Sequence, residues 1–112
     1  MELERKLEML NDESSLADIQ NYMNEAIRKR GFQDETEKDI LLFLTEELGE
    51  LAHAVRKKTN MKMDVDKSND SDIKREIADI FSYILAMCRV LDIDLLQAFK
   101  DKESKNCKRK WQ

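Results

Sequence analysis

The chain has no proline and only two glycines, Gly31 and Gly49, and this shortage of turn residues restricts its fold more than any other feature. Sheet proteins reverse direction every few residues and depend on glycine, proline and related turn chemistry at each reversal. Long helices need neither residue, and the chain is rich in Ala, Leu, Glu, Lys, Met and Gln, which are good helix formers. The sequence therefore predicts an all-α protein, a bundle of antiparallel helices.

Apolar residues recur three and four positions apart, which is the spacing of amphipathic helices. This periodicity predicts helices over residues 16–30, 36–58, 72–91 and 95–105, with a short first helix or frayed extension over 2–10. Ser15 followed by Asp18 predicts a capping box, and Gly31 a glycine just past a helix end. The apolar run Ile40–Phe43 predicts deep burial of that part of the second main helix. The polar stretch 59–71 predicts a loop that is long for a helix–helix connection.

The length of 112 residues predicts a single domain over residues 1–112, with 1–14 as an N-terminal extension. A chain this short buries a smaller fraction of its surface than a larger one does, so it can fold alone, but sharing a core with a second copy would help. The two cysteines show no metal-binding spacing, and Cys88 lies in an apolar helical run, as core residues do.

The charge and hydropathy of the sequence limit the kinds of partner that the protein can bind. Charged residues make up 39% of the chain and the net charge is −4, with one basic cluster near the end. The absence of a domain-wide basic surface argues against binding to a nucleic acid polymer. No apolar run approaches the length of a membrane span or resembles a signal segment. We therefore expect a cytoplasmic protein with no membrane partner.

Two helices carry acids in matching positions. Glu47 and Glu50 stand three residues apart beside the stripe Leu44, Leu48, Leu51 and Val55; Glu76 and Asp79 do so beside the stripe Ile73, Ile77, Ile80 and Ile84. One constant offset superimposes every position of the two patterns. If the helices pack antiparallel with their stripes facing, both acid pairs reach the same side. The chain reversal at 59–71 favours that arrangement.

Clustered carboxylates repel one another, and a divalent cation would relieve the repulsion. An all-oxygen ligand set suits Mg²⁺, with Mn²⁺ or Ca²⁺ as alternatives, and Mg²⁺ often shares its shell with substrate phosphates. A di-iron site is an alternative, but such sites usually contain a Glu-x-x-His pair. His53 belongs to neither of the two acid pairs. We interpret His53 as a surface residue. The simpler alternative, in which the acids are ordinary solvated surface, stays open at this point.

The segment Glu46-Glu47-Leu48-Gly49-Glu50-Leu51-Ala52, followed by Glu76-Ile77-Ala78-Asp79, resembles the MazG-like branch of the all-α NTP pyrophosphohydrolases. The resemblance covers about residues 16–111. It extends to Arg30-Gly31-Phe32, to the break Leu91-Asp92-Ile93-Asp94-Leu95, and to the basic run Lys105-Asn106-Cys107-Lys108-Arg109.

The resemblance implies cleavage of a nucleotide between its α and β phosphates by a site that holds Mg²⁺ on Glu47, Glu50, Glu76 and Asp79. It makes Glu46 a candidate for positioning or activating the attacking water, although the metal could activate water without it. It implies that Tyr83, one turn after Asp79, contacts the base or sugar. Phosphate contacts are implied for Lys102, Lys105, Asn106 and Arg109, while Arg56 and Lys57 are weaker candidates. Small members of the family need a partner to cover the apolar faces of the acid-bearing helices, so the resemblance also implies a homodimer or homotetramer.

Several alternatives remain within and outside the family. Phosphoribosyl-ATP pyrophosphatases typically carry histidine where this chain has Tyr83, and dimeric dUTPases are usually longer. A dCTP-preferring relative stays open, because base choice rests on few contacts. We favour hydrolysis of non-standard or excess (d)NTPs. A non-catalytic interaction module would not need the two acid pairs in register. A nucleotide or metal sensor would keep the same ligands without turnover.

Overall fold

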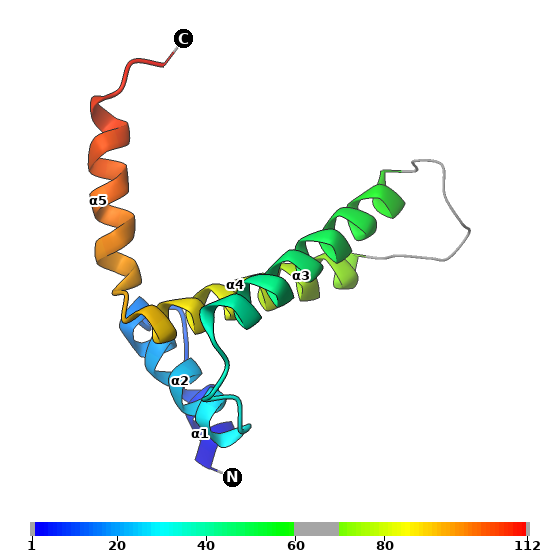
Figure 1. Ribbon diagram of the computed structural model, residues 1–112, viewed down its shortest axis with the longest axis vertical. Coiled ribbons are helices and arrows are strands. Elements are labelled where there is room, and N and C mark those ends of the chain that lie inside the picture. Colours follow the sequence, from blue (N-terminus) through cyan, green and yellow to red (C-terminus); the bar gives the residue numbers. More distant parts are fainter. Residues whose placement is uncertain (1, 60–69, 112) are drawn as a thin grey trace. The chain divides into compact units, whose positions relative to one another are not determined.

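The computed structural model describes residues 2–59 and 70–111, and this part of the chain is helical with no strand. Its elements are α1 (Glu2–Met9), α2 (Leu16–Lys29), α3 (Glu37–Lys58), α4 (Asp70–Leu91) and α5 (Leu95–Lys108), shown in Figure 1. The all-α prediction is confirmed, and α5 extends three residues past its expected end. Helix α4 begins inside the expected loop, and the remainder of that loop, residues 60–69, lies outside the described residues.

Local side-chain chemistry sets several helix ends. Ser15 and Asp18 form the predicted capping box, in which each side chain accepts a hydrogen bond from the other residue's backbone N–H. Thr36 and Asp39 form a second box at the start of α3. Gly31 follows the last turn of α2 with φ of 82°, a conformation that suits a residue without Cβ. These caps pair backbone groups that the helix itself leaves unpaired.

The chain divides into two compact units, one made of Met1–Asp34 with Cys88–Gln112 and the other of Glu35–Met87. In the first unit, α1 is tied to α2 because the Lys6 ammonium lies 2.5 Å from a carboxylate oxygen of Glu25. The side chain of Gln20 on α2 donates to the Ile93 carbonyl at 3.1 Å and accepts from the Leu95 N–H at 3.2 Å. Polar contacts of α2 therefore hold both α1 and the start of α5 within this unit.

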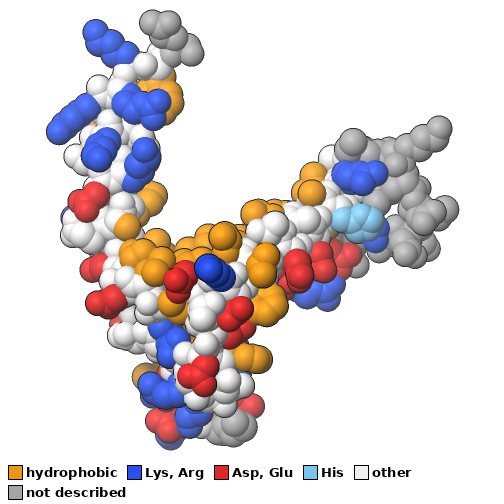
Figure 2. Space-filling model, viewed as in Figure 1, with side chains coloured by type: hydrophobic (Ala, Val, Ile, Leu, Met, Phe, Trp, Pro, Cys, Tyr) orange, Lys and Arg blue, Asp and Glu red, His pale blue; other side chains and the backbone are white. Residues whose placement is uncertain are grey.

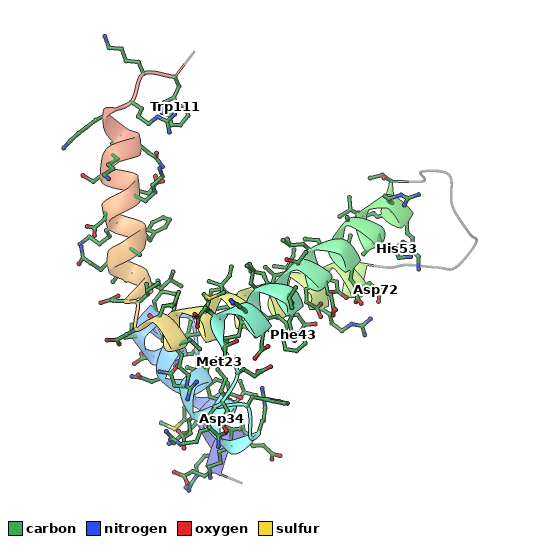
Figure 3. All side chains as sticks on the ribbon, in the orientation of Figure 1. Met23, Asp34, Phe43, His53, Asp72 and Trp111 are labelled. Atoms are coloured by element: carbon green, nitrogen blue, oxygen red, sulfur yellow. The ribbon has the colours of Figure 1, made fainter. Side chains whose placement is uncertain are left out.

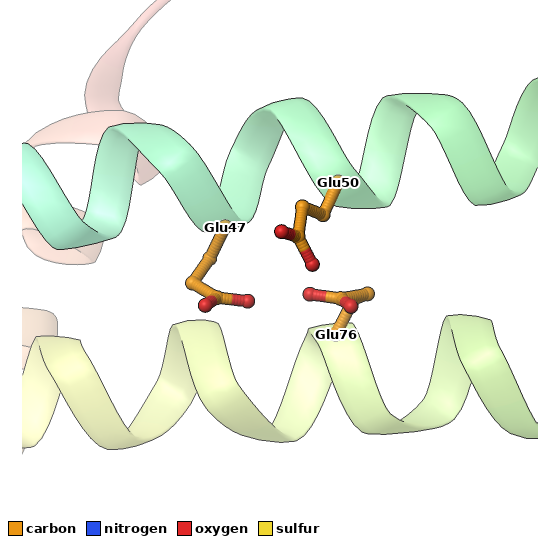
Figure 4. A group of neighbouring side chains, drawn as sticks. All are labelled: Glu47, Glu50 and Glu76. Carbon is orange, nitrogen blue, oxygen red and sulfur yellow. The ribbon is translucent and has the colours of Figure 1, made fainter.

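The second unit is a hairpin in which α3 and the first part of α4 run antiparallel, side by side (Figures 1 and 4). Ile40, Ala54 and Leu85 are buried, Ile40 and Leu85 to within 2% of full burial. The expectation that 40–43 is deeply buried is wrong for the single chain, because Leu41 is 55% and Leu42 66% exposed. Two helices can cover only one strip of each other, so an apolar run on all sides stays partly open.

None of the described helices combines the length and apolarity needed to cross a membrane.

Candidate functional site

The hairpin brings three of the four predicted acids together. Carboxylate oxygens of Glu47, Glu50 and Glu76 all lie within 4.8 Å of one another. Figure 4 shows the three side chains pointing into the space between α3 and α4. The antiparallel packing inferred from the matching stripes therefore carries acids of both helices to one side of the pair, as expected from their register.

Asp79 stands one helical turn beyond Glu76 and is exposed to solvent. It does not belong to the group of carboxylates within 4.8 Å in the described part of the chain. Its negative charge is nevertheless close enough to contribute to a raised pKa at both Glu76 and Tyr83. A role for Asp79 as the fourth ligand stays a prediction.

The carboxylate cluster contains buried oxygen atoms that lack hydrogen-bond partners. Oε2 of Glu47 and Oε2 of Glu76 are buried, and neither has a hydrogen-bond partner among the described residues. Ionised carboxylates only accept hydrogen bonds, so two of them cannot satisfy each other. The pKa of Glu76 is accordingly raised, chiefly because its protonated form can donate a hydrogen bond to Glu47, then by burial and by the charge of Glu47, while a hydrogen bond with Glu50 lowers it. A proton or a cation must stabilise this arrangement.

A divalent cation fits these residues. The donor set contains only carboxylate oxygens, which hard cations such as Mg²⁺ prefer. Two of the oxygens are buried without a partner, so a bound ion would meet a need that the described protein groups do not meet. The same observation argues against ordinary solvated surface, because solvated carboxylates do not bury their oxygens.

An aromatic pair lies at one end of the acid cluster. The Tyr83 ring stacks on the Phe43 ring with centroids 5.9 Å apart and planes inclined by 29°. The pKa of Tyr83 is raised by burial and by the negative charges of Glu47, Glu35, Asp79 and Glu46, in that order. Tyr83 therefore keeps its proton near neutral pH and can donate a hydrogen bond. Phe43 was not singled out by the sequence, although it precedes Glu47 by one turn of α3.

A groove of about 480 Å³ extends from the cluster toward the end of the hairpin. It is lined by α3 and α4 residues, namely Glu46, Gly49, Glu50, His53, Ala54, Lys57, Asp72 and Glu76. Glu46 thus shares a surface with two of the clustered acids, as its proposed role requires. His53 is exposed, as predicted, and Figure 3 shows it at the same end of the hairpin as Asp72. Its place in the groove was missed, and the signal was its spacing of one turn from Glu50.

The residues predicted to contact phosphate belong to the first unit, not to the hairpin. Lys102, Lys105 and Asn106 belong to α5, and Arg109 caps its C-terminal end. Lysine and arginine side chains gather along this helix (Figure 2). Asn106 donates to Glu103 at 2.7 Å, and the Arg109 guanidinium lies 4.3 Å from the centroid of the Trp111 ring. Contact between these four side chains and phosphate stays a prediction.

Fold and site together define an all-α protein whose antiparallel hairpin presents clustered carboxylates suited to a divalent cation. The sequence model of the MazG nucleotide pyrophosphohydrolase domain matches residues 35–112, and the chain belongs to this family. The match begins where the hairpin unit begins and includes the acids of the hairpin, Glu46, Glu47, Glu50, Glu76 and Asp79. No curated protein matches the chain. Membership in the family indicates nucleotide pyrophosphohydrolase activity.

Proposed function

We propose that the protein is a Mg²⁺-dependent pyrophosphohydrolase that cleaves (d)NTPs to (d)NMPs and pyrophosphate, acting on non-standard or excess nucleotides. The observation that carries the proposal is the carboxylate cluster, with oxygens within 4.8 Å and two of them buried without a partner, in a chain of this family. Its substrates would be free nucleotides, so we also propose a cytoplasmic location.

Glu47, Glu50 and Glu76 would hold the cation, with Asp79 proposed as a fourth ligand from the next turn of α4. Mg²⁺ is the proposed ion and Mn²⁺ a substitute, since both accept carboxylate oxygens. When bound, the ion would neutralise phosphate charge and make water a better nucleophile. Holding three carboxylates together is the contribution of the chain, and the antiparallel hairpin supplies it.

Other residues of the hairpin would orient the reactants. Glu46 lines the groove beside Glu50 and is proposed to hold the attacking water and accept its proton. Water oxygen would bond to the α-phosphorus as the bond to the α–β bridging oxygen breaks, which releases pyrophosphate. Tyr83, held by its stack on Phe43, is proposed to contact the base or sugar through its ring and protonated hydroxyl. Lys102, Lys105, Asn106 and Arg109 are proposed to bind phosphate oxygens.

We also propose that the protein assembles as a homodimer or homotetramer. Large apolar side chains of the hairpin are open to solvent in the single chain, including Leu42, Leu48 at 51% and Ile77 at 54% exposure. Covering such residues is favourable by roughly 25 cal/mol per Å² of apolar surface. A second copy would supply the missing cover. Light scattering should give a mass of two or four chains, and a monomeric mass at working concentration would refute this part.

The activity is tested by incubating the protein with Mg²⁺ and a panel of NTPs and dNTPs and measuring pyrophosphate and monophosphate. We expect release that is abolished by EDTA and by Glu50→Gln, which removes a ligand charge but keeps the side-chain size. Glu8→Gln on α1 is the matched control and should leave turnover unchanged. Absence of release across the panel with both Mg²⁺ and Mn²⁺ would refute the proposal and favour a nucleotide sensor or an interaction module.

A further inference from the structure

Several residues that line the groove belong to a series of side chains along one face of α3. Phe43, Glu47, Glu50, His53 and Lys57 follow one another at intervals of four, three, three and four residues. Such intervals keep residues on the same side of a helix. The chemistry along this face changes from an aromatic ring through two carboxylates to an imidazole and an ammonium group. A nucleoside triphosphate has a matching order, from a flat base through metal-binding phosphates to an anionic terminal phosphate.

Within the hairpin unit, each part of this series has neighbours that suit the matching part of a nucleotide. Phe43 stacks on Tyr83 at one end, and Glu47 and Glu50 meet Glu76 in the middle. His53 and Lys57 line the groove that begins at Glu50 and Glu76. Seven residues separate Glu50 from Lys57, about 10 Å along the helix. A lysine side chain on a helix leans toward the N-terminus, which brings its ammonium group closer to the cluster.

Lys57 is the cation best placed for a ligand. It is half-buried, whereas the neighbouring Arg56 and Lys58 are exposed. Within residues 2–59 and 70–111, Lys57 makes no ion pair or side-chain hydrogen bond. Asp72, the acid across the groove, is ion-paired with Arg75, so part of its charge is already balanced. The Lys57 ammonium group therefore has no acceptor among these residues, and a phosphate oxygen in the groove would accept a charge-assisted hydrogen bond from it.

We propose that Lys57, assisted by His53, binds the terminal phosphate of the nucleotide and then the leaving pyrophosphate. This inference rests on the proposed function and deepens it, because it assigns a direction to the substrate. The base lies toward Phe43 and Tyr83, and the γ-phosphate lies toward the end of the hairpin. It also gives a physical reason for a triphosphate substrate, since a diphosphate lacks the group that Lys57 would hold. The enzyme should therefore prefer a nucleoside triphosphate to the corresponding diphosphate.

The test compares kcat/KM for one NTP and its matching NDP in the wild-type protein and in Lys57→Met, which keeps the side-chain length but removes the charge. A hydrogen bond to a charged group is worth roughly a tenfold to hundredfold change in rate or affinity. We expect kcat/KM to fall at least about tenfold for the NTP and by less than about threefold for the NDP. Lys57→Arg should retain the triphosphate preference, and His53→Gln should lose part of it.

The control is Lys74→Met, which removes an exposed lysine of α4 that does not line the groove. It should behave as the wild-type protein on both substrates. Circular dichroism of each variant verifies that the helices are intact. An equal loss on NTP and NDP in Lys57→Met, or no loss on either, would overturn the assignment while leaving the proposed function standing.

A binding measurement separates the two proposals. Inorganic pyrophosphate is titrated with Mg²⁺ into each protein by calorimetry, and Lys57→Met should bind it about tenfold more weakly than the wild-type protein and Lys74→Met. If the wild-type protein turns over no nucleotide yet binds pyrophosphate through Lys57, the assignment stands and the proposed function fails. If it neither turns over nucleotides nor binds pyrophosphate, both are overturned.

Discussion

Replacement of Gly49 by alanine should make the protein more stable. Gly49 occupies an exposed position inside α3, a helix of 22 residues, where glycine is less favourable than alanine by about 0.8–1.0 kcal/mol. Apart from its own helical backbone, no heavy atom of the described residues lies within 4 Å of where a Cβ at this position would be, so alanine introduces neither a clash nor strain. We expect the free energy of unfolding to rise by about 1 kcal/mol, which corresponds to roughly 4 °C in Tm for a chain of this size.

The same substitution should slow turnover. Gly49 lines the groove beside Glu46 and Glu50, and its packing against residues 2–59 and 70–111 does not require a glycine. A methyl group would occupy groove space in which we propose that substrate phosphates bind. We therefore expect kcat/KM for an NTP to fall several-fold while stability increases, the usual cost of a residue kept for function.

Urea denaturation followed by circular dichroism measures the first effect, and pyrophosphate release measures the second. Ala52→Gly is the mirror control, because Ala52 is also exposed on α3 but does not line the groove. It should lose about 1 kcal/mol of stability with turnover unchanged. A destabilised Gly49→Ala protein would refute the reasoning about open space. A stabilised protein with normal turnover would refute a role for Gly49 in the groove.

Three further predictions concern the cluster and the core. Mg²⁺ should raise the Tm of the wild-type protein but not that of Glu50→Gln, with a stabilisation of about 2.7 kcal/mol when the ion is at 100 times its Kd; calorimetry at several ion concentrations measures it, and an equal effect on both proteins would contradict the ligand assignment. In EDTA, the raised pKa of Glu76 means that the folded state binds a proton more tightly than the unfolded state. Its contribution should therefore favour folding as the pH falls from neutral toward the ordinary pKa of a glutamate carboxyl, and should be lost as the pH rises through the folded pKa. Urea denaturation at several pH values should show this trend in the wild-type protein and not in Glu76→Gln. Leu85→Ala should lower the free energy of unfolding by about 2–5 kcal/mol, because Leu85 is 2% exposed; a loss below about 1 kcal/mol in thermal denaturation would show that the site collapses around the smaller side chain.

The helices and several of their ends could be predicted because their signals are local. The capping box of Ser15 with Asp18 needs only two residues three positions apart, and Gly31 needs only the helix that precedes it. The Thr36–Asp39 box carries the same signal and could have been found in the same way. The tie between Lys6 and Glu25 could not, since opposite charges nineteen positions apart occur throughout a chain this rich in charge.

The acid cluster was predictable to the extent that backbone register decides it. A constant offset between two amphipathic patterns fixes which positions face each other in an antiparallel pair. It does not fix which rotamers the long side chains adopt, so it could not show that Asp79 would stay outside the close group. The groove lined by His53 and Lys57 depends on the same rotamers and on the space above Gly49.

The apolar run at the start of α3 was misjudged because the hydrophobic pattern records that a side chain is to be buried, not which partner buries it. In the single chain, Leu41 and Leu42 stay exposed although Ile40 beside them is buried. The helices that expose these apolar side chains also hold the mutually repelling acids Glu47, Glu50 and Glu76. Contacts from a second copy that fix α3 against α4 would lower the free-energy cost of keeping the carboxylates together. Association and metal binding would then strengthen each other, because any coupling between two binding events acts equally in both directions.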